Sequence, residues 1–187
     1  MDAQTRSVRV EKSSLWLPEV HVGDTVSLSG TVYTARDAAH KKLMALLEAG
    51  LPLPFPLEGA FVYYAGPTPA PAGRVCGSFG PTTSGRMDGF APTLYRRGLK
   101  GTIGKGGRSK EVVDAIRETG GCYLIAVGGA GAFYAGKIVK YEEIAFPELG
   151  CESVKRLEFC DFPLTVAIDA YGNDLFGVVS KQLKSCQ

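Results

Sequence analysis

Long apolar runs are absent from this sequence of 187 residues. No stretch approaches the roughly 20 consecutive apolar residues that a membrane-spanning helix needs. The opening segment, MDAQTRSVRVEKSS, is largely polar and charged and lacks the apolar centre of a secretion signal. We therefore expect a soluble, cytoplasmic protein with no membrane partner. Hydrophobic residues make up 45% and charged residues 21% of the chain, which is typical of a globular protein and excludes disordered, coiled-coil and collagen-like chains.

Closely spaced cysteines are also missing. The odd number of cysteines and their wide spacing argue against a disulfide framework and a zinc ribbon. The same spacing argues against an iron–sulfur cluster held by this chain alone. We therefore predict no metal site in the chain and interpret the cysteines as buried or incidental thiols. The five cysteines are Cys76, Cys122, Cys151, Cys160 and Cys186.

Complete nucleotide-binding motifs are missing as well. Gly104–Lys105 lacks both the earlier glycine and the following Ser or Thr that a P-loop requires. A dinucleotide-binding fingerprint that begins at Gly129 would need a third glycine where Tyr134 stands. We therefore interpret these glycines as residues that turn the chain.

Positive charge is concentrated in residues 74–110. This segment carries eight basic residues against a single acid, Asp88, in a chain whose formal net charge is only +2. Such a concentration indicates an anionic ligand or surface, although a solvated basic face is the simpler interpretation of a charge run.

The hydrophobic pattern predicts an α/β fold in one domain, residues 1–187. Alternating residues over 26–33 predict a half-buried strand. A helix is expected from Thr34 to Gly50, with Thr34 and Asp37 as a capping box. Other strands are predicted at 60–66, 122–127, 157–161 and 164–169, helices at 88–97 and 109–120, glycine loops at 101–107 and 128–136, and a turn at 172–174 before LFGVV.

Cations and hydroxyls recur where the predicted strands turn into helices. Arg36 lies near the start of the first helix. Thr82, Thr83 and Arg86 lie in GPTTSGR before a helix, and Lys105 lies in IGKGG before another. Helix N-termini carry partial positive charge and free N–H groups, so cations placed there oppose the dipole and cost stability. Their repetition indicates a compact polyanion as ligand, for example a dicarboxylate.

Five blocks of the sequence resemble a known family. TVYTARDAAHKKL, YYAGPTP, GPTTSGRMD, IGKGG and DFPLTVAIDAYGNDLF are similar to the β subunit, or C-terminal domain, of class I fumarases and L-tartrate dehydratases. The resemblance implies a swivelling β/β/α fold with a mixed central sheet or barrel-like core and flanking helices. It also implies closure over a [4Fe–4S] cluster held by an α subunit or N-terminal domain, for which this chain has no counterpart.

The resemblance also implies roles for particular residues. Arg36, Arg86 and Lys105 would bind the substrate carboxylates, and Lys105 would also be catalytic. Thr82 would lie at the reacting carbons as the candidate general base, although a Thr hydroxyl needs activation to act as a base at neutral pH. GKGG stands where some relatives have GKGN, which leaves open a side-chain contact at position 107.

The activity implied by the resemblance is that of a hydro-lyase β subunit, active only with its α subunit. Reversible hydration of fumarate to (S)-malate is the first expectation. The L(+)-tartrate dehydratase β subunit is the alternative, since both substrates present two carboxylates to the same cations. A basic nucleic-acid-binding module is a less favoured hypothesis, because only Phe90 and Tyr95 interleave the basic residues as stacking platforms. A structural subunit whose cations form interface ion pairs is a third hypothesis. His40 is interpreted as supporting structure.

Overall fold

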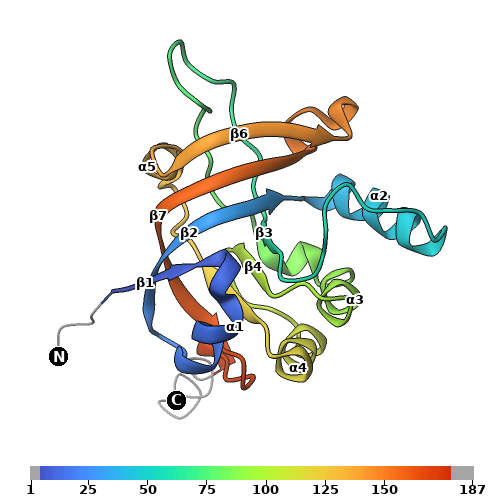
Figure 1. The fold of residues 1–187 in the computed structure, drawn as a ribbon, viewed down its shortest axis with the longest axis vertical. Helices are drawn as coiled ribbons and strands as arrows, with labels where there is room; N and C mark the ends of the chain where they lie inside the picture. Colours follow the sequence, from blue (N-terminus) through green and yellow to red (C-terminus); the bar gives the residue numbers. More distant parts are fainter. Residues whose placement is uncertain (1–4, 178–187) are drawn as a thin grey trace, which may run out of the picture.

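The computed structural model of the chain describes residues 5–177, which form a curved sheet flanked by helices (Figure 1). The strands are β1 (Arg6–Arg9), β2 (Thr25–Thr34), β3 (Phe61–Tyr63), β4 (Gly101–Gly104), β5 (Cys122–Ile125), β6 (Ile138–Ala145) and β7 (Val154–Ile168). The helices are α1 (Ser13–Trp16), α2 (Asp37–Glu48), α3 (Ala91–Arg96), α4 (Lys110–Thr119) and α5 (Gly131–Ala135). Short 3-10 turns lie at Val10–Lys12, Leu17–Glu19, Ser84–Met87 and Pro147–Glu152.

The sheet closes on itself through β7. β2, β3, β4 and β5 are parallel neighbours in that order. β7 then runs antiparallel to both β5 and β2, which completes a five-strand, barrel-like ring. β1 and β6 extend the sheet beside β2 and β7 respectively. The predicted mixed α/β fold with a barrel-like core and flanking helices is confirmed.

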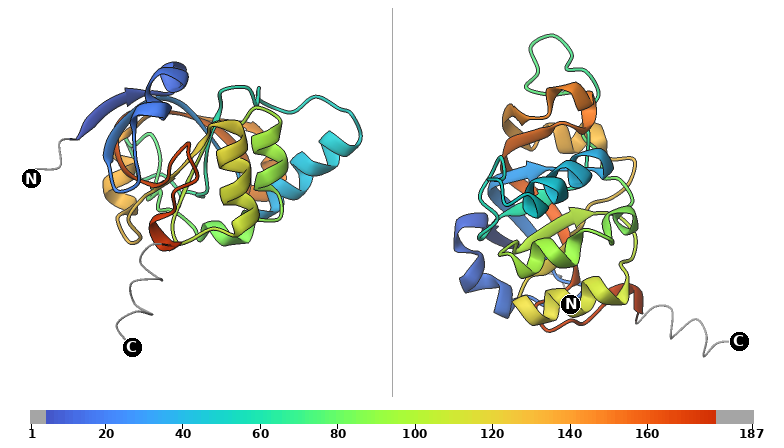
Figure 2. Two further views of the ribbon diagram at one scale, coloured as in Figure 1. Left: turned by 90° about the horizontal axis from the view of Figure 1, so that it is seen from below. Right: turned by 90° about the vertical axis from the view of Figure 1, so that its right-hand side faces the viewer.

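Side chains on the two faces of the sheet form two cores. Phe61 and Tyr63 of β3 point into the barrel, whereas Val62 points outward toward the helices. This alternation follows from the two-residue period of a strand. Helices α2, α3 and α4 cover the outer core on one side of the barrel (Figure 2). The largest inner residues include Trp16, Leu28, Phe79, Phe159 and Phe162, and the outer ones include Leu43, Tyr64, Leu94, Tyr95, Ile116 and Tyr123.

The strand predicted at 26–33 is confirmed as β2, in which every second residue is buried. The helix predicted from Thr34 is wrong at its start, because α2 begins at Asp37. Thr34 remains in β2, where its hydroxyl accepts the N–H of Lys155 (3.0 Å) and donates to the carbonyl of Ser153 (3.3 Å). Arg36 is therefore the residue that precedes the helix rather than a residue of its first turn.

Other predicted boundaries also change. The two strands predicted at 157–161 and 164–169 are one long strand, β7, bent at Asp161, whose φ is 50°. The predicted helix 88–97 is shorter in the structure: residues 88–90 form a turn, α3 spans 91–96, and a 3-10 turn at 84–87 precedes them. The predicted loop 128–136 contains α5. The LFGVV segment after the predicted turn is described only to Gly177, where residues 175–177 are helical, and 178–179 lie outside the described residues.

Two strands were not predicted. β6 is exposed or half-exposed along most of its length, so its sequence lacks a regular apolar alternation. β1 has four residues, of which one is buried. In residues 5–177, no helix has the length and apolar character needed to cross a membrane.

Gly101 permits a close packing contact between neighbouring strands. Its register partner is Phe61, and a Cβ at position 101 would overlap the Phe61 ring. We expect Gly101→Ala to lower the free energy of unfolding by about 1–3 kcal/mol, since overpacking a buried site forces strain. Urea denaturation measures the change.

Gly89→Ala is the matched control, because a Cβ there meets nothing within 4 Å. We expect this variant to stay within about 0.5 kcal/mol of wild type. Equal stabilities of the two variants would contradict the packing argument.

Candidate active site at the strand ends

The predicted site residues follow the carboxyl ends of neighbouring parallel strands. Arg36 follows β2, the segment with Thr82 and Arg86 follows β3, and Lys105 follows β4. Carboxyl ends of parallel strands lie at one edge of a sheet, which is where open α/β sheets bind ligands. The topology therefore places all four residues at the same end of the barrel.

Main-chain hydrogen bonds join the Thr82 segment to the Lys105 loop. The N–H of Lys105 donates to the carbonyl of Thr82 (3.2 Å), and the N–H of Ser84 donates to the carbonyl of Lys105 (2.9 Å). The N–H of Thr82 in turn donates to the carbonyl of Tyr64 (2.7 Å). Thr82 and Lys105 therefore lie on adjacent backbone segments.

Close packing in this region requires glycine at position 104. A Cβ at Gly104 would overlap the hydroxyl of buried Ser84. The hydroxyl of Tyr123 lies 2.9 Å from Oγ of Ser84 and 2.8 Å from the carbonyl oxygen of Gly106. Tyr123 thus ties both loops to β5. At Gly107, by contrast, a Cβ would make ordinary contact with Phe176 at 3.6 Å, so this position has space for a side chain.

Arg86 is joined to the start of α2. Its Nε donates to Oδ1 of Asp37 at 2.9 Å, and its Nη2 lies 2.8 Å from Oδ2. Asp37 immediately follows Arg36, so this ion pair joins Arg86 to the residue next to Arg36 in the chain. Half of the Arg86 side chain remains exposed.

Arg36 is held by an acid from a distant part of the chain. Its Nη2 lies 3.2 Å from Oε1 of Glu152, while Oε2 of Glu152 accepts the N–H of Ala38 at 3.0 Å. Glu152 therefore caps α2 from outside, at a helix end where a carboxylate is favourable. A side chain at Gly66 would crowd both Nη1 of Arg36 and the carbonyl of Cys151, which explains the glycine in YYAGPTP.

A buried lysine supports the turn that carries Glu152. Nζ of Lys155 donates to the carbonyls of Gly150 (3.0 Å), Cys151 (2.8 Å) and Ser153 (2.9 Å). Burial lowers the pKa of Lys155 below its ordinary value. The amino group thus satisfies carbonyl groups that would otherwise lose hydrogen bonds on burial.

Lys105 differs from the two arginines. Its side chain extends along the loop after β5, since a Cβ at Gly128 would lie 3.8 Å from Nζ. Across residues 5–177, Nζ has neither an ion pair nor a hydrogen bond. The hydroxyl of half-buried Thr82 likewise has no hydrogen-bond partner within that range. Among the described residues, no group is therefore hydrogen-bonded to Thr82 in a way that would activate it as a base.

A buried ion pair between the segment after β3 and the segment after β4 was not predicted. Nε of Arg108, whose side chain is fully buried, donates to Oδ1 of Asp88 at 2.6 Å. Oδ2 of Asp88 accepts the N–H of Ser109 at 2.6 Å, at the start of α4. The Arg108 guanidinium also lies over the rings of Tyr64 (5.3 Å) and Tyr123 (5.0 Å). Arg108, one of the basic residues of segment 74–110, is therefore a structural residue.

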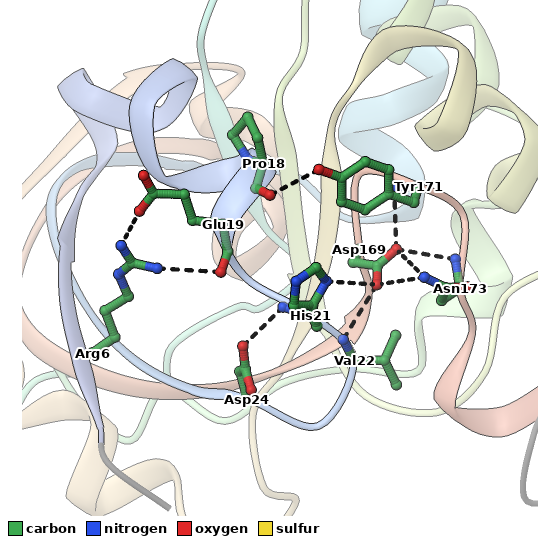
Figure 3. A network of polar contacts seen from close by, with 9 residues as sticks. All are labelled: Arg6, Pro18, Glu19, His21, Val22, Asp24, Asp169, Tyr171 and Asn173. Carbon is green, nitrogen blue, oxygen red and sulfur yellow. Dashed lines mark hydrogen bonds and ion pairs between the residues drawn. The ribbon is translucent and has the colours of Figure 1, made fainter.

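The last sequence block starts at the opposite end of the barrel, where a network of polar contacts anchors it (Figure 3). The buried carboxylate of Asp169 accepts the N–H groups of Val22 (3.3 Å) and Asn173 (3.1 Å), which ties the segment after β7 to the segment before β2. Asp174 then accepts the N–H of Phe176 at 3.0 Å. Phe176 lies against Gly107. The block therefore runs from the far end of the barrel to the loop that carries Lys105, which it meets at Phe176.

His40 lies beneath the site and is fully buried. Its Nδ1 lies 2.9 Å from the carbonyl oxygen of Arg36, and its ring stacks on Phe90 and meets the edge of Tyr64. Desolvation lowers the pKa of His40 from 6.5 to about 4. The ring is therefore neutral at pH 7, with Nδ1–H donating to Arg36, as a supporting residue would be.

The described residues do not fit an iron–sulfur cluster. Between residues 5 and 177, no group of three or more His, Cys, Asp or Glu side chains could hold a metal ion. Cys76 and Cys122 are buried singly, and Cys151 and Cys160 are exposed. Cys186 lies outside the described residues.

Comparison with known proteins settles the family. The model described as "Fumarase C-terminus" matches residues 1–179. This chain belongs to the fumarase C-terminal family. It is 42% identical to fumarate hydratase 2 of Leishmania major over 169 residues, and 42% identical to the anaerobic class I fumarate hydratase of Escherichia coli (strain K12) over 173 residues.

The family contains proteins of different lengths. The matches cover 89% and 91% of this chain but only 30% and 32% of those two fumarate hydratases. The L(+)-tartrate dehydratase subunit beta of Methanocaldococcus jannaschii is 38% identical over 171 residues, and the match covers 88% of each chain. This fumarase C-terminal chain therefore spans about a third of the fumarate hydratases it resembles.

The lowered pKa of His40 predicts a pH-dependent stability. Between pH 6.5 and pH 4 the unfolded chain binds a proton at His40 that the folded chain does not. The associated stability is complete above pH 6.5 and is lost as the pH falls toward 4. We expect wild type to lose up to about 3 kcal/mol more than His40→Gln over this range.

Chemical denaturation at a series of pH values measures this difference. Above pH 6.5 the curves of wild type and His40→Gln should run parallel, since His40 is then neutral in both the folded and the unfolded chain. Curves that stay parallel below pH 6.5 as well would mean that His40 is not held neutral.

Proposed function

We propose that this chain is the β part of a two-part hydro-lyase that hydrates fumarate reversibly to (S)-malate. The observation that carries the proposal is the gathering of Arg36, Arg86 and Lys105 beside Thr82 at one end of the barrel. Relatives named fumarate hydratase and tartrate dehydratase subunit beta support it.

The cations suit the charge that develops in this reaction. Hydration adds a hydroxyl group to one alkene carbon and a proton to the other, and negative charge builds on the neighbouring carboxylate. Arg36 and Arg86 would bind and orient the two carboxylates, and Lys105, the cation without a partner acid, would stabilise the developing charge. Thr82 would exchange the proton at the reacting carbon, activated by a group from outside the described residues.

Fumarate is the substrate that we propose first, since fumarate hydratase is the name that most of the quoted relatives carry. L(+)-Tartrate remains the alternative, supported by the relative that matches this chain over 88% of its own length. Both substrates are dicarboxylates that the same three cations would bind.

We propose that a partner α subunit holds the [4Fe–4S] cluster. A relative named as a subunit beta, which matches this chain over 88% of each length, supports a separate partner polypeptide. The absence of a fitting ligand group in residues 5–177 is consistent with this arrangement.

The basic segment gives little support to nucleic-acid binding. Several of its cations are paired with acids, as in the ion pairs Arg96–Glu118 and Arg108–Asp88. Tyr95 is buried and donates to the carbonyl of Cys122, so it is no stacking platform for bases.

Lys105→Met tests the proposed role of the unpaired cation. In the enzyme assembled with its α subunit, we expect turnover of fumarate to fall at least about a hundredfold, the scale for losing one preorganised charge contact. Steady-state kinetics give the turnover. Folding should change by less than about 0.5 kcal/mol, because the side chain is exposed.

Lys110→Met is the matched control, since Lys110 is 81% exposed on α4 and follows the same loop. It should keep wild-type turnover. Loss of folding in Lys105→Met, or wild-type turnover, would remove Lys105 from the site.

The isolated chain tests the assignment of the cluster to the partner. Purified without oxygen and supplied with iron and sulfide, it should show no visible iron–sulfur absorbance and no hydratase activity. Addition of the α subunit should restore both. A stoichiometric cluster on the chain alone would contradict this part of the proposal.

A further inference from the structure

Arg86 reaches the site with one side of its guanidinium already occupied. A guanidinium has five N–H donors in a planar, fixed arrangement. Asp37 accepts from Nε (2.9 Å) and lies against Nη2 (2.8 Å), so it occupies the side formed by these two nitrogens. The donors that remain are both hydrogens of Nη1 and the outer hydrogen of Nη2. Of these, one hydrogen on Nη1 and the outer one on Nη2 point past the end of the side chain, parallel to each other.

We propose that Asp37 is a positioning residue that sets which side of the Arg86 guanidinium meets the substrate. The inference rests on the proposed function. With Nε held by Asp37, Arg86 can form a two-point contact with a substrate carboxylate only through Nη1 and Nη2. The carboxylate is therefore gripped end-on, in a plane fixed by the first residue of α2.

The negative charge of Asp37, considered by itself, would weaken substrate binding. A carboxylate beside the site repels a dicarboxylate, so on electrostatic grounds its removal should strengthen substrate binding. The Asp37–Arg86 ion pair also contributes little to the stability of the fold, because Arg86 is 50% exposed and ion pairs at such sites contribute about 0–1 kcal/mol. Orientation of Arg86 is the role in which Asp37 favours the reaction.

Orientation and charge therefore predict opposite changes in kcat/KM when Asp37 is neutralised. In the assembled enzyme, we expect Asp37→Asn to lower kcat/KM for fumarate by at least about tenfold, since misplacing a positioning group costs that much or more. An unchanged or increased kcat/KM would overturn the proposal. Glu118→Gln is the matched control: it removes the acid of a similar arginine ion pair on α4, with Nε–Oε2 at 2.8 Å, away from the site. It should leave kcat/KM within twofold of wild type.

A double-mutant comparison separates orientation from a change in α2. Lysine has no planar set of donors to orient, so in an Arg86→Lys background Asp37→Asn should change kcat/KM by less than about twofold. The same tenfold loss in both backgrounds would show that Asp37 acts through the helix and would overturn the proposal. If Arg86→Lys alone keeps wild-type kcat/KM, the role of Arg86 in the proposed function fails, and the inference fails with it.

A second variant tests the proposal if Asp37→Asn does not fold. Asp37→Glu keeps the charge at the start of α2 and displaces the carboxylate by one methylene group. A loss of kcat/KM in this variant supports orientation, and wild-type kcat/KM overturns it.

Discussion

The pairing of β7 with two different strands is the constraint on which the site depends. β7 lies antiparallel to β2 along most of its length and to β5 near its end. Closure of the ring places the carboxyl ends of the parallel strands β2 to β5 around one rim of the barrel. Three cations that are far apart in the sequence then lie around one end of the barrel. Without this closure, the segments after β2 and β4 would follow separate parts of an open sheet.

The same strand also fixes the acid that holds Arg36. The turn that carries Glu152 precedes β7, and Lys155 in β7 binds the carbonyls of that turn. The hydroxyl of Thr34 joins the end of β2 to β7 at the same level. Arg36 is thus held between the end of β2 and the start of β7. Within the described chain, Lys105 is the cation of the site that keeps no acid partner.

Much of this arrangement could be predicted from the sequence. The alternation over 26–33 identified β2, because one face of that strand is buried along its whole length. The unpredicted β6 has no such buried face. The capping box at Thr34 failed because a tertiary contact with Lys155 uses the hydroxyl that a helix cap would need. Local patterns do not contain that information.

The residues of the candidate site could be proposed from the sequence, but the contacts that position them could not. Cations at strand-to-helix turns and the family resemblance both pointed to Arg36, Arg86 and Lys105. The acids that position them, Asp37 and Glu152, lie 49 and 116 positions from their partners, so no local pattern pairs them. Family resemblance can therefore identify the residues of a candidate site, whereas the hydrogen bonds and ion pairs between them are known only from the three-dimensional structure.

A structure of the enzyme assembled with its α subunit and bound to succinate, a dicarboxylate that cannot be hydrated, would show directly where the substrate binds. We expect Nζ of Lys105 and Nη1 of Arg86 to lie within about 2.7–3.2 Å of succinate carboxylate oxygens, with Asp37 still bonded to Nε of Arg86. Succinate bound away from these cations, with Lys105 paired to an acid of the α subunit, would contradict the central claim that this end of the barrel binds the substrate.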